Sequence, residues 1–163
     1  MARTEPEAPP TPLDETDIRV AVAVAGFHRR LSTQLLDGAR ARLAAAGLDP
    51  ERVEDFWVPG SFELPLTVRS LAESGHYAAV IALGVVIRGE TPHFEYVSDV
   101  AAKGISQAGL ETRVPCTFGV LTCDTQDQAE ARAGGSVGNA GSDAADAAVV
   151  MANLLGTIRT PVG

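Results

Sequence analysis

The chain has few cysteines: only Cys116 and Cys123 occur among its 163 residues. They lie seven residues apart around one short apolar run, and this odd spacing directs their side chains to opposite faces of a strand. A disulfide between them is therefore not expected. For the same reason the pair does not predict a metal site.

Long apolar runs and clusters of basic residues are also missing. No segment has the length of apolar sequence that a membrane span needs, and the N-terminus lacks the apolar core of a signal peptide. The 13 Lys and Arg residues are scattered, and the net charge is −8. Because nucleic-acid surfaces need clustered positive charge, we expect a cytoplasmic protein without a membrane or nucleic-acid partner.

The first 17 residues differ in composition from the rest. They include four prolines and several acids but almost no apolar residues, so they can bury too little surface to offset the entropy of ordering. We expect a disordered arm over residues 1–17, one domain over residues 18–158 and a short tail over residues 159–163. A chain of this length suits a single domain.

Within the domain, short apolar runs alternate with segments of helical periodicity. Strands alternating with helices imply parallel pairing, because each crossover helix returns the chain to the same edge of the sheet. The sequence predicts a flavodoxin-like three-layer αβα sandwich with a four-stranded, mainly parallel sheet. The expected strands are residues 18–26, 52–58, 78–87 and 116–122; the expected helices are residues 31–46, 64–74, 93–105, 125–133 and 143–155.

In such sheets, ligands bind beyond the carboxyl ends of the strands, where the loops converge near a switch in strand order. Four unusual segments each follow an expected strand: residues 26–28, 59–63, 88–93 and 122–124. We therefore expect these four segments to meet on one rim of the sheet and to form the ligand site there.

The segment that ends in Thr91, Pro92 and His93 is typical of a helix start. Thr91 suits the N-cap and Pro92 the first helical position, which places His93 in the first turn. A helix N-terminus attracts anions and disfavours a nearby imidazolium, so a neutral His93 is suited to act as a base near pH 7. A lone histidine there would more often only cap or pack, but its position beside Arg88 favours a functional role.

Other candidates are weaker when taken singly. Phe27 and Phe62 could stack on a planar heterocycle, although ordinary core packing is the common role of such rings. Ser61 and Glu63 could bind a polyol or a ring N–H, whereas a lone acid at a helix start usually complements the dipole. Arg132 could grip a phosphate with two donors, but an arginine near a helix end usually caps carbonyls.

Three motifs together resemble one enzyme family. VPGSFELP (Val58 to Pro65), LGVVIRGETPHFEYV (Leu83 to Val97) and FGVLTCDTQDQAEARAG (Phe118 to Gly134) resemble 6,7-dimethyl-8-ribityllumazine synthase, in collinear order over about residues 18–156. The resemblance implies a transferase that condenses 5-amino-6-ribitylaminouracil with 3,4-dihydroxy-2-butanone 4-phosphate. The product is the lumazine, with phosphate and water released, and no cofactor or metal is needed.

The resemblance also implies roles for individual residues. His93 would transfer protons, and Arg132 would hold the leaving phosphate together with Glu90 and Thr91. Phe118 matches a position that the family contributes from a neighbouring subunit. The substrate-binding residues implied in this way are Phe27, His28, Ser61, Phe62, Glu63, Val85, Val86, Ile87 and Phe118.

Two further expectations follow from the resemblance. The family forms homopentamers, and because the loop from Gly134 to Gly141 lacks an insertion, an icosahedral capsid is possible. Family members usually carry a lysine where this chain has Ala140. That departure leaves open an alternative, a weakly active or inactive paralogue that binds a lumazine or flavin or serves as a shell protein.

Overall fold

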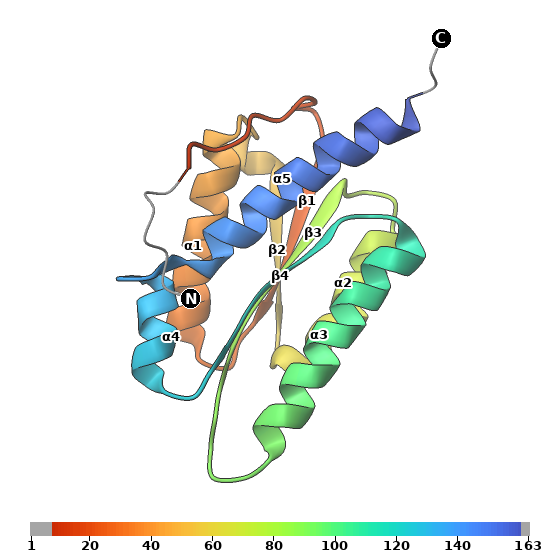
Figure 1. The fold of residues 1–163 in the computed structure, drawn as a ribbon. Coiled ribbons are helices and arrows are strands. Elements are labelled where there is room, and N and C mark those ends of the chain that lie inside the picture. The colour runs from red at the N-terminus through yellow and green to blue at the C-terminus, as the bar shows by residue number, and fades with distance from the viewer. Residues whose placement is uncertain (1–7, 161–163) are drawn as a thin grey trace.

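The computed structural model describes residues 8–160, which form three layers around one four-stranded sheet (Figure 1). The strands are β1 (Val20–Ala25), β2 (Val53–Val58), β3 (Ala79–Ile87) and β4 (Cys116–Cys123), in the order β2-β1-β3-β4 and all parallel. This is the flavodoxin-like order without a fifth strand. The predicted fold class is confirmed, and strand order reverses between β1 and β3.

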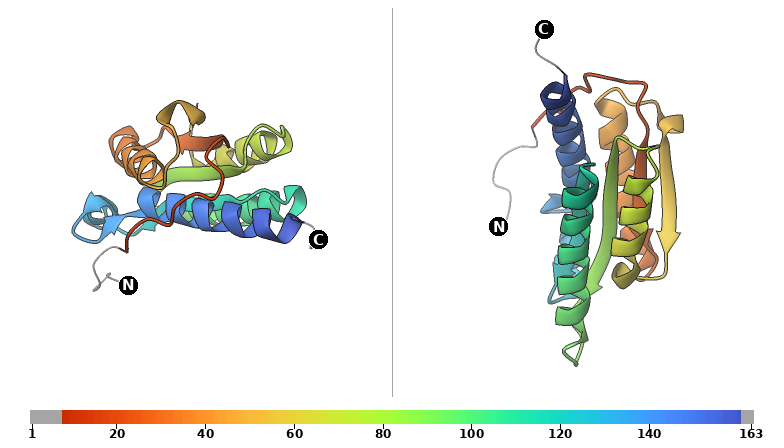
Figure 2. Two further views of the ribbon diagram at one scale, coloured as in Figure 1. Left: turned by 90° about the horizontal axis from the view of Figure 1, so that it is seen from above. Right: turned by 90° about the vertical axis from the view of Figure 1, so that its right-hand side faces the viewer.

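Helices cover both faces of the sheet (Figure 2). One face packs against α1 (Arg29–Ala45) and α5 (Ala140–Arg159), and the other against α2 (Leu64–Glu73) and α3 (His93–Thr112). The side chains of β1 alternate between the two cores, valines toward α1 and α5 and alanines toward α2 and α3. This is the period-two pattern of a central strand that is buried on both faces.

The two cysteines confirm the same alternation on β4. Cys123 belongs to the core beneath α5, whereas Cys116 packs in the core beneath α3, so their thiols lie on opposite faces of the sheet and both are free. Burial raises the pKa of Cys116 to about 11. That thiol therefore stays protonated at neutral pH.

The start of α5 is fixed by close contact with α1. Asn139 accepts hydrogen bonds from the backbone N–H groups of Gly141 (2.8 Å) and Ser142 (3.2 Å) and donates to the carbonyl of Gln34 (2.9 Å). A Cβ on Gly141 would lie 2.0 Å from the carbonyl oxygen of Leu35. The helix therefore begins three residues before the expected start at residue 143.

Several short elements complete the chain. The 3₁₀ turns are Pro50–Arg52 and Ser61–Glu63, α4 is Gln126–Arg132, and β5 (Ala133–Gly135) pairs antiparallel with β6 (Gly138–Asn139). The sequence did not predict the β5–β6 pair. Gly47, directly after Ala46, has a φ of 100°, a left-handed conformation that glycine adopts readily after a helix.

The start of α3 differs from the prediction. The helix begins at His93 with Pro92 in the capping position, and no side chain caps it. The prediction that Thr91 is the N-cap was wrong. Its hydroxyl makes no capping hydrogen bond, so the first N–H groups of α3 are not occupied by a side-chain cap.

Residues 8–17 lie across α1 and α5 instead of forming a disordered arm. Leu13 is 9% exposed, and its N–H donates to the carbonyl of Ala46 (2.9 Å). The Asn153 amide accepts from the N–H of Asp14 (3.0 Å) and donates to the carbonyl of Pro12 (2.9 Å). The rest of the expected arm, residues 1–7, and the end of the expected tail, residues 161–163, lie outside the described residues.

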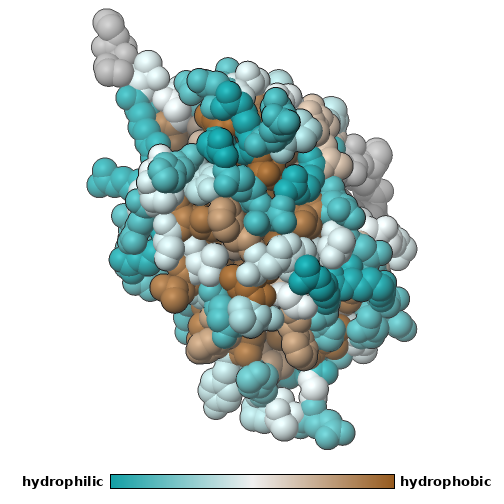
Figure 3. Space-filling model, turned by 180° about the vertical axis from the view of Figure 1, so that it is seen from behind, coloured by the Kyte–Doolittle hydropathy of each residue, from teal (hydrophilic) through white to brown (hydrophobic). Residues whose placement is uncertain are grey.

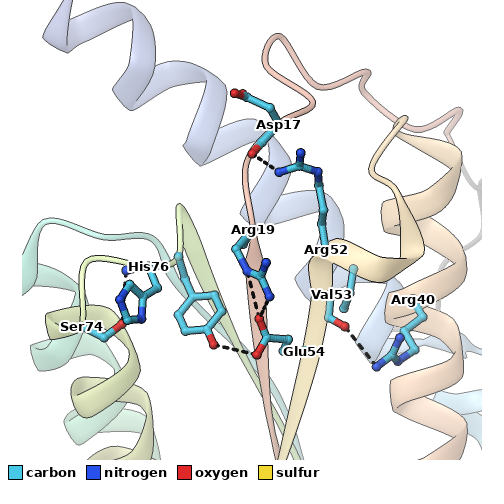
Figure 4. Close-up of polar contacts among 9 residues, drawn as sticks. Asp17, Arg19, Arg40, Arg52, Val53, Glu54, Ser74 and His76 are labelled. Atoms are coloured by element: carbon cyan, nitrogen blue, oxygen red, sulfur yellow. Dashed lines mark hydrogen bonds and ion pairs between the residues drawn. The ribbon is translucent and has the colours of Figure 1, made fainter.

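A polar cluster joins the amino ends of β1, β2 and β3 (Figure 4). Arg19 donates through Nε to a Glu54 carboxylate oxygen (2.9 Å), and the Tyr77 hydroxyl donates to the other oxygen (3.1 Å). The hydrogen bond from Arg19 is the main cause of a lowered pKa at Glu54. His76 lies exposed in the turn before β3, where its backbone N–H donates to Ser74 Oγ (3.3 Å). Within residues 8–160, no helix has the length and apolarity to cross a membrane.

Candidate active site

A pocket of about 640 Å³ lies at the carboxyl ends of β1, β2 and β3, beside the switch in strand order. Three of the four predicted rim segments line it, namely residues 26–28 in part, 59–63 and 88–93 in part. The fourth segment, residues 122–124, does not line the pocket; its Asp124 accepts a hydrogen bond from Arg88 (2.7 Å), at the start of the β3–α3 loop. The lining residues are Phe27, His28, Pro59, Gly60, Ser61, Phe62, Glu63, Val85, Val86, Ile87, Gly89, Thr91, His93, Phe94 and Val97.

Two aromatic rings lie on the exposed part of this pocket. Phe27 is 69% exposed and Phe62 is 57% exposed, which argues against ordinary core packing for either ring. The loop that carries Phe27 is tied to the end of β2, because its N–H donates to the carbonyl of Pro59 (3.0 Å). Seen from behind, apolar residues are interspersed with hydrophilic ones, and several gather in the lower half, above the more hydrophilic tip where the β3–α3 loop lies (Figure 3).

Ser61 supplies a buried hydroxyl to the pocket. The residue is 5% exposed, and its Oγ has no hydrogen-bond partner among the described residues. Gly84 of β3 makes room for it, since a Cβ at that position would lie 2.6 Å from Ser61 Oγ. Buried hydroxyls are nearly always paired, so this one is suited to bind a polar ligand group.

Glu63 has a structural contact as well as a place in the pocket. One of its carboxylate oxygens accepts from the N–H of Gly60 (3.0 Å), which holds the turn that carries Ser61. The side chain is otherwise exposed. Its second oxygen is therefore available to a ligand.

His28 has an unusual backbone conformation. Its φ of 59° and ψ of 47° lie in the left-handed region, which is uncommon for residues other than glycine, although asparagine, aspartate and histidine are enriched there. Its ring meets that of Phe27 edge-on, with centroids 4.9 Å apart, and burial lowers its pKa. A strained residue that lines a pocket is a common mark of a functional position.

The first turn of α3 reaches the pocket with more residues than the sequence indicated. His93 and Thr91 are exposed and line it together with Gly89. Phe94 and Val97, which the sequence analysis did not single out, also line the pocket. The sequence contains a pattern that could have predicted this. The apolar stripe of α3 starts at Phe94, two turns before the first fully buried residue, Ala101, so the start of the stripe lies beyond the sheet.

Three predicted site residues do not line the pocket of their own chain: Glu90, Phe118 and Arg132. Phe118 is 44% exposed on the edge strand β4. Arg132 donates to the carbonyl of Gln128 (3.1 Å), one turn back in α4. Their roles in binding remain predictions, and residues 8–160 hold no group of three or more acidic, His or Cys side chains that could bind a metal ion.

The parallel strand order and the pocket at its switch point define an α/β protein with a small-molecule site of the flavodoxin-like class. A sequence model of the family described as 6,7-dimethyl-8-ribityllumazine synthase matches residues 17–156. A protein of that name from Thermus thermophilus is 51% identical over 141 residues, covering 86% of this chain and 90% of the relative. Another from Coxiella burnetii is 46% identical over 147 residues, covering 90% and 97%. The chain therefore belongs to the 6,7-dimethyl-8-ribityllumazine synthase family.

Proposed function

We propose that this protein condenses 5-amino-6-ribitylaminouracil with 3,4-dihydroxy-2-butanone 4-phosphate to form 6,7-dimethyl-8-ribityllumazine, as a transferase of riboflavin biosynthesis. The observation that carries the proposal is the pocket itself. It combines exposed aromatic rings, a buried hydroxyl without a partner and the N-terminus of α3 with His93, in a chain of this family.

One side of the pocket suits the pyrimidine substrate. Val85, Val86 and Ile87 form an apolar strand end on which a planar ring can rest, and Phe27 offers an exposed face for stacking. The hydroxyl of Ser61 and the free oxygen of Glu63 can bind the ribityl chain and the ring edge. His28 and Phe62 complete this side.

The other side suits the phosphorylated substrate. The first turn of α3 presents backbone N–H groups without a side-chain cap, and helix N-termini favour anions. Thr91 adds a hydroxyl, and Glu90 and Arg132 are assigned to the same phosphate through the family. His93 would move protons while an imine forms, phosphate leaves and the ring closes.

A second copy of the chain is part of the proposal. Phe118 and Arg132 do not line the pocket of their own chain, and Phe118 matches a position that the family contributes from a neighbouring subunit, which supports a site completed by a second copy. A homopentamer or higher assembly would supply them and would also cover an apolar stripe on α5. The stripe consists of Val150, Met151, Leu154 and Ile158, each at least 38% exposed. We propose a cytoplasmic homopentamer, with a capsid as the larger form, and mass photometry distinguishes the two.

The decisive experiment follows the absorbance and fluorescence of the lumazine after purified protein is mixed with both substrates. We expect product well above the spontaneous rate, and a drop of roughly 10²-fold or more in His93→Ala, the usual contribution of a general acid or base. His76→Ala is the matched control, because His76 is exposed at the opposite end of the sheet.

An Ala140→Lys variant tests the alternative. If wild type is active and the lysine changes the rate little, Ala140 is a tolerated variation. If only the lysine variant forms product, the chain is a paralogue whose pocket serves binding or assembly. No product from either protein would refute the proposed reaction.

A further inference from the structure

Arg88 begins the loop that leads from β3 to the pocket, and its side chain contacts residues on both sides of that loop. It follows the last residue of β3, and its N–H donates to the carbonyl of Cys123 (2.9 Å), which extends the β3–β4 ladder by one residue. Its Nε donates to Asp124 (2.7 Å), and its Nη1 binds Glu95. Its Cζ lies 4.3 Å from the ring centroid of Phe94.

These contacts come from both flanks of one loop. Residues 88–92 connect β3 to α3 and carry Gly89 and Thr91 to the pocket. Glu95 and Phe94 belong to the first turn of α3, beside His93, whereas Asp124 follows β4. One guanidinium thus joins the helix that carries His93 to the neighbouring strand end.

The positive charge of Arg88 is already paired with the carboxylates of Glu95 and Asp124. Two carboxylates share one guanidinium, so the cluster as a whole is negative, and the guanidinium lowers the pKa of Glu95. A group in this state is poorly suited to bind a phosphate. Among the described residues, neither Glu90 nor Thr91 makes a side-chain hydrogen bond, so Arg88 provides the side-chain contacts that fix the loop.

We propose that Arg88 is a positioning residue, which holds the β3–α3 loop and the first turn of α3 in place through Asp124, Glu95 and Phe94, and is not itself a ligand of the phosphate. This inference rests on the proposed function for its kinetic consequences. Its structural part does not, and the two parts can be measured separately.

The first measurement is hydrogen exchange of the backbone amides of residues 89–95 in the unliganded protein. Arg88→Gln and Glu95→Gln should both exchange faster there, because each removes the same link. The matched control is Arg69→Gln. Arg69 also binds two carboxylates, Glu73 (2.8 Å) and Glu111 (2.7 Å), with similar exposure, but at the far end of α3. It should leave residues 89–95 unchanged.

The second measurement is steady-state kinetics with each substrate varied in turn. Arg88→Gln should raise the KM for the butanone phosphate roughly fivefold to tenfold, with little change in the KM for the pyrimidine. Glu95→Gln should raise the same KM, and the double variant should be no worse than Arg88→Gln. Arg88→Lys should not restore the loop, because a lysine lacks the planar fork that reaches both carboxylates.

A direct phosphate ligand would behave differently. Glu95→Gln would then free the guanidinium and lower the KM for the phosphate substrate, and Arg88→Lys would retain much of the affinity. Either result overturns the proposal, as does unchanged exchange at residues 89–95 in Arg88→Gln. If wild type forms no lumazine, the proposed function fails, while the exchange measurement still decides whether Arg88 fixes the loop.

Discussion

Gly84→Ala tests whether the pocket depends on close packing between β3 and Ser61. The added Cβ would lie 2.6 Å from Ser61 Oγ, 3.1 Å from Ala25 Cβ and 3.4 Å from Leu64 Cδ1. The first distance is well below van der Waals contact, and Leu64 and Ala25 are fully buried, so the site cannot relax freely. Overpacking of this kind costs about 1–3 kcal/mol.

A cost of about 2 kcal/mol corresponds to a fall of roughly 4–8 °C in Tm for a domain of this size. Circular dichroism melts at fixed protein concentration measure it. The control is Gly156→Ala inside α5, because a Cβ there would meet no side chain or other element within 4 Å among residues 8–160. That change should stabilise the helix by about 0.5–1 kcal/mol.

The clash with Ser61 predicts coupling between the two positions. Ser61→Ala removes the atom in the shortest contact, so Gly84→Ala should cost less in that background, by about 0.5–2 kcal/mol. Gly84→Ala alone should also raise the KM for the pyrimidine substrate, since the added Cβ displaces the Ser61 hydroxyl that lines the pocket. Equal costs of Gly84→Ala in both backgrounds would show that Ser61 is not the limiting contact and would refute the packing argument.

Two further predictions concern conformational strain and charge. His28→Asn should be more stable than His28→Ala by about 1 kcal/mol in urea unfolding, because both remove the ring but only asparagine tolerates the left-handed backbone well; equal midpoints would contradict this. Since Arg19 lowers the pKa of Glu54, this group contributes stability that is complete above its ordinary value of 4.5 and is lost as pH falls through the lower folded value. Wild type should therefore be more stable than Glu54→Gln at neutral pH and should converge with it once the pH falls below the folded pKa of Glu54, whereas a constant difference would exclude this linkage.

Much of the fold could be predicted because its strands carry strong local signals. The apolar run of residues 79–87 predicted β3, and the seven-residue spacing of the cysteines predicted that their thiols lie on opposite faces of β4. The convergence of loops at the carboxyl ends is a general property of parallel sheets, and it placed most of the pocket. His93, Ser61 and Phe27 were predicted in this way without any knowledge of side-chain contacts.

The features that were missed depend on contacts between residues far apart in the chain. Leu13 is one apolar residue in a proline-rich, acidic segment, and composition does not show that Asn153 binds the backbone on both sides of it. The early start of α5 likewise depends on Asn139 meeting α1. Phe94 reaches the pocket only because α3 extends beyond β3, which is a matter of relative position of two elements.

Ala140 now has a structural context that the sequence could not supply. It is the first residue of α5 and packs partly against the core beneath α1, next to the capping residue Asn139. A Cβ on Gly141 would lie 2.0 Å from the carbonyl oxygen of Leu35, so this end of α5 is packed tightly against α1. Arg132 is the last residue of α4, and the β5–β6 pair lies between it and Ala140; it is the cation proposed above to bind the phosphate. If the protein is active with Ala140, Arg132 and the N-terminus of α3 must bind the phosphate without help from a lysine at position 140. The Arg88 contacts that hold the start of α3 should then matter more in this protein than in family members that carry the lysine.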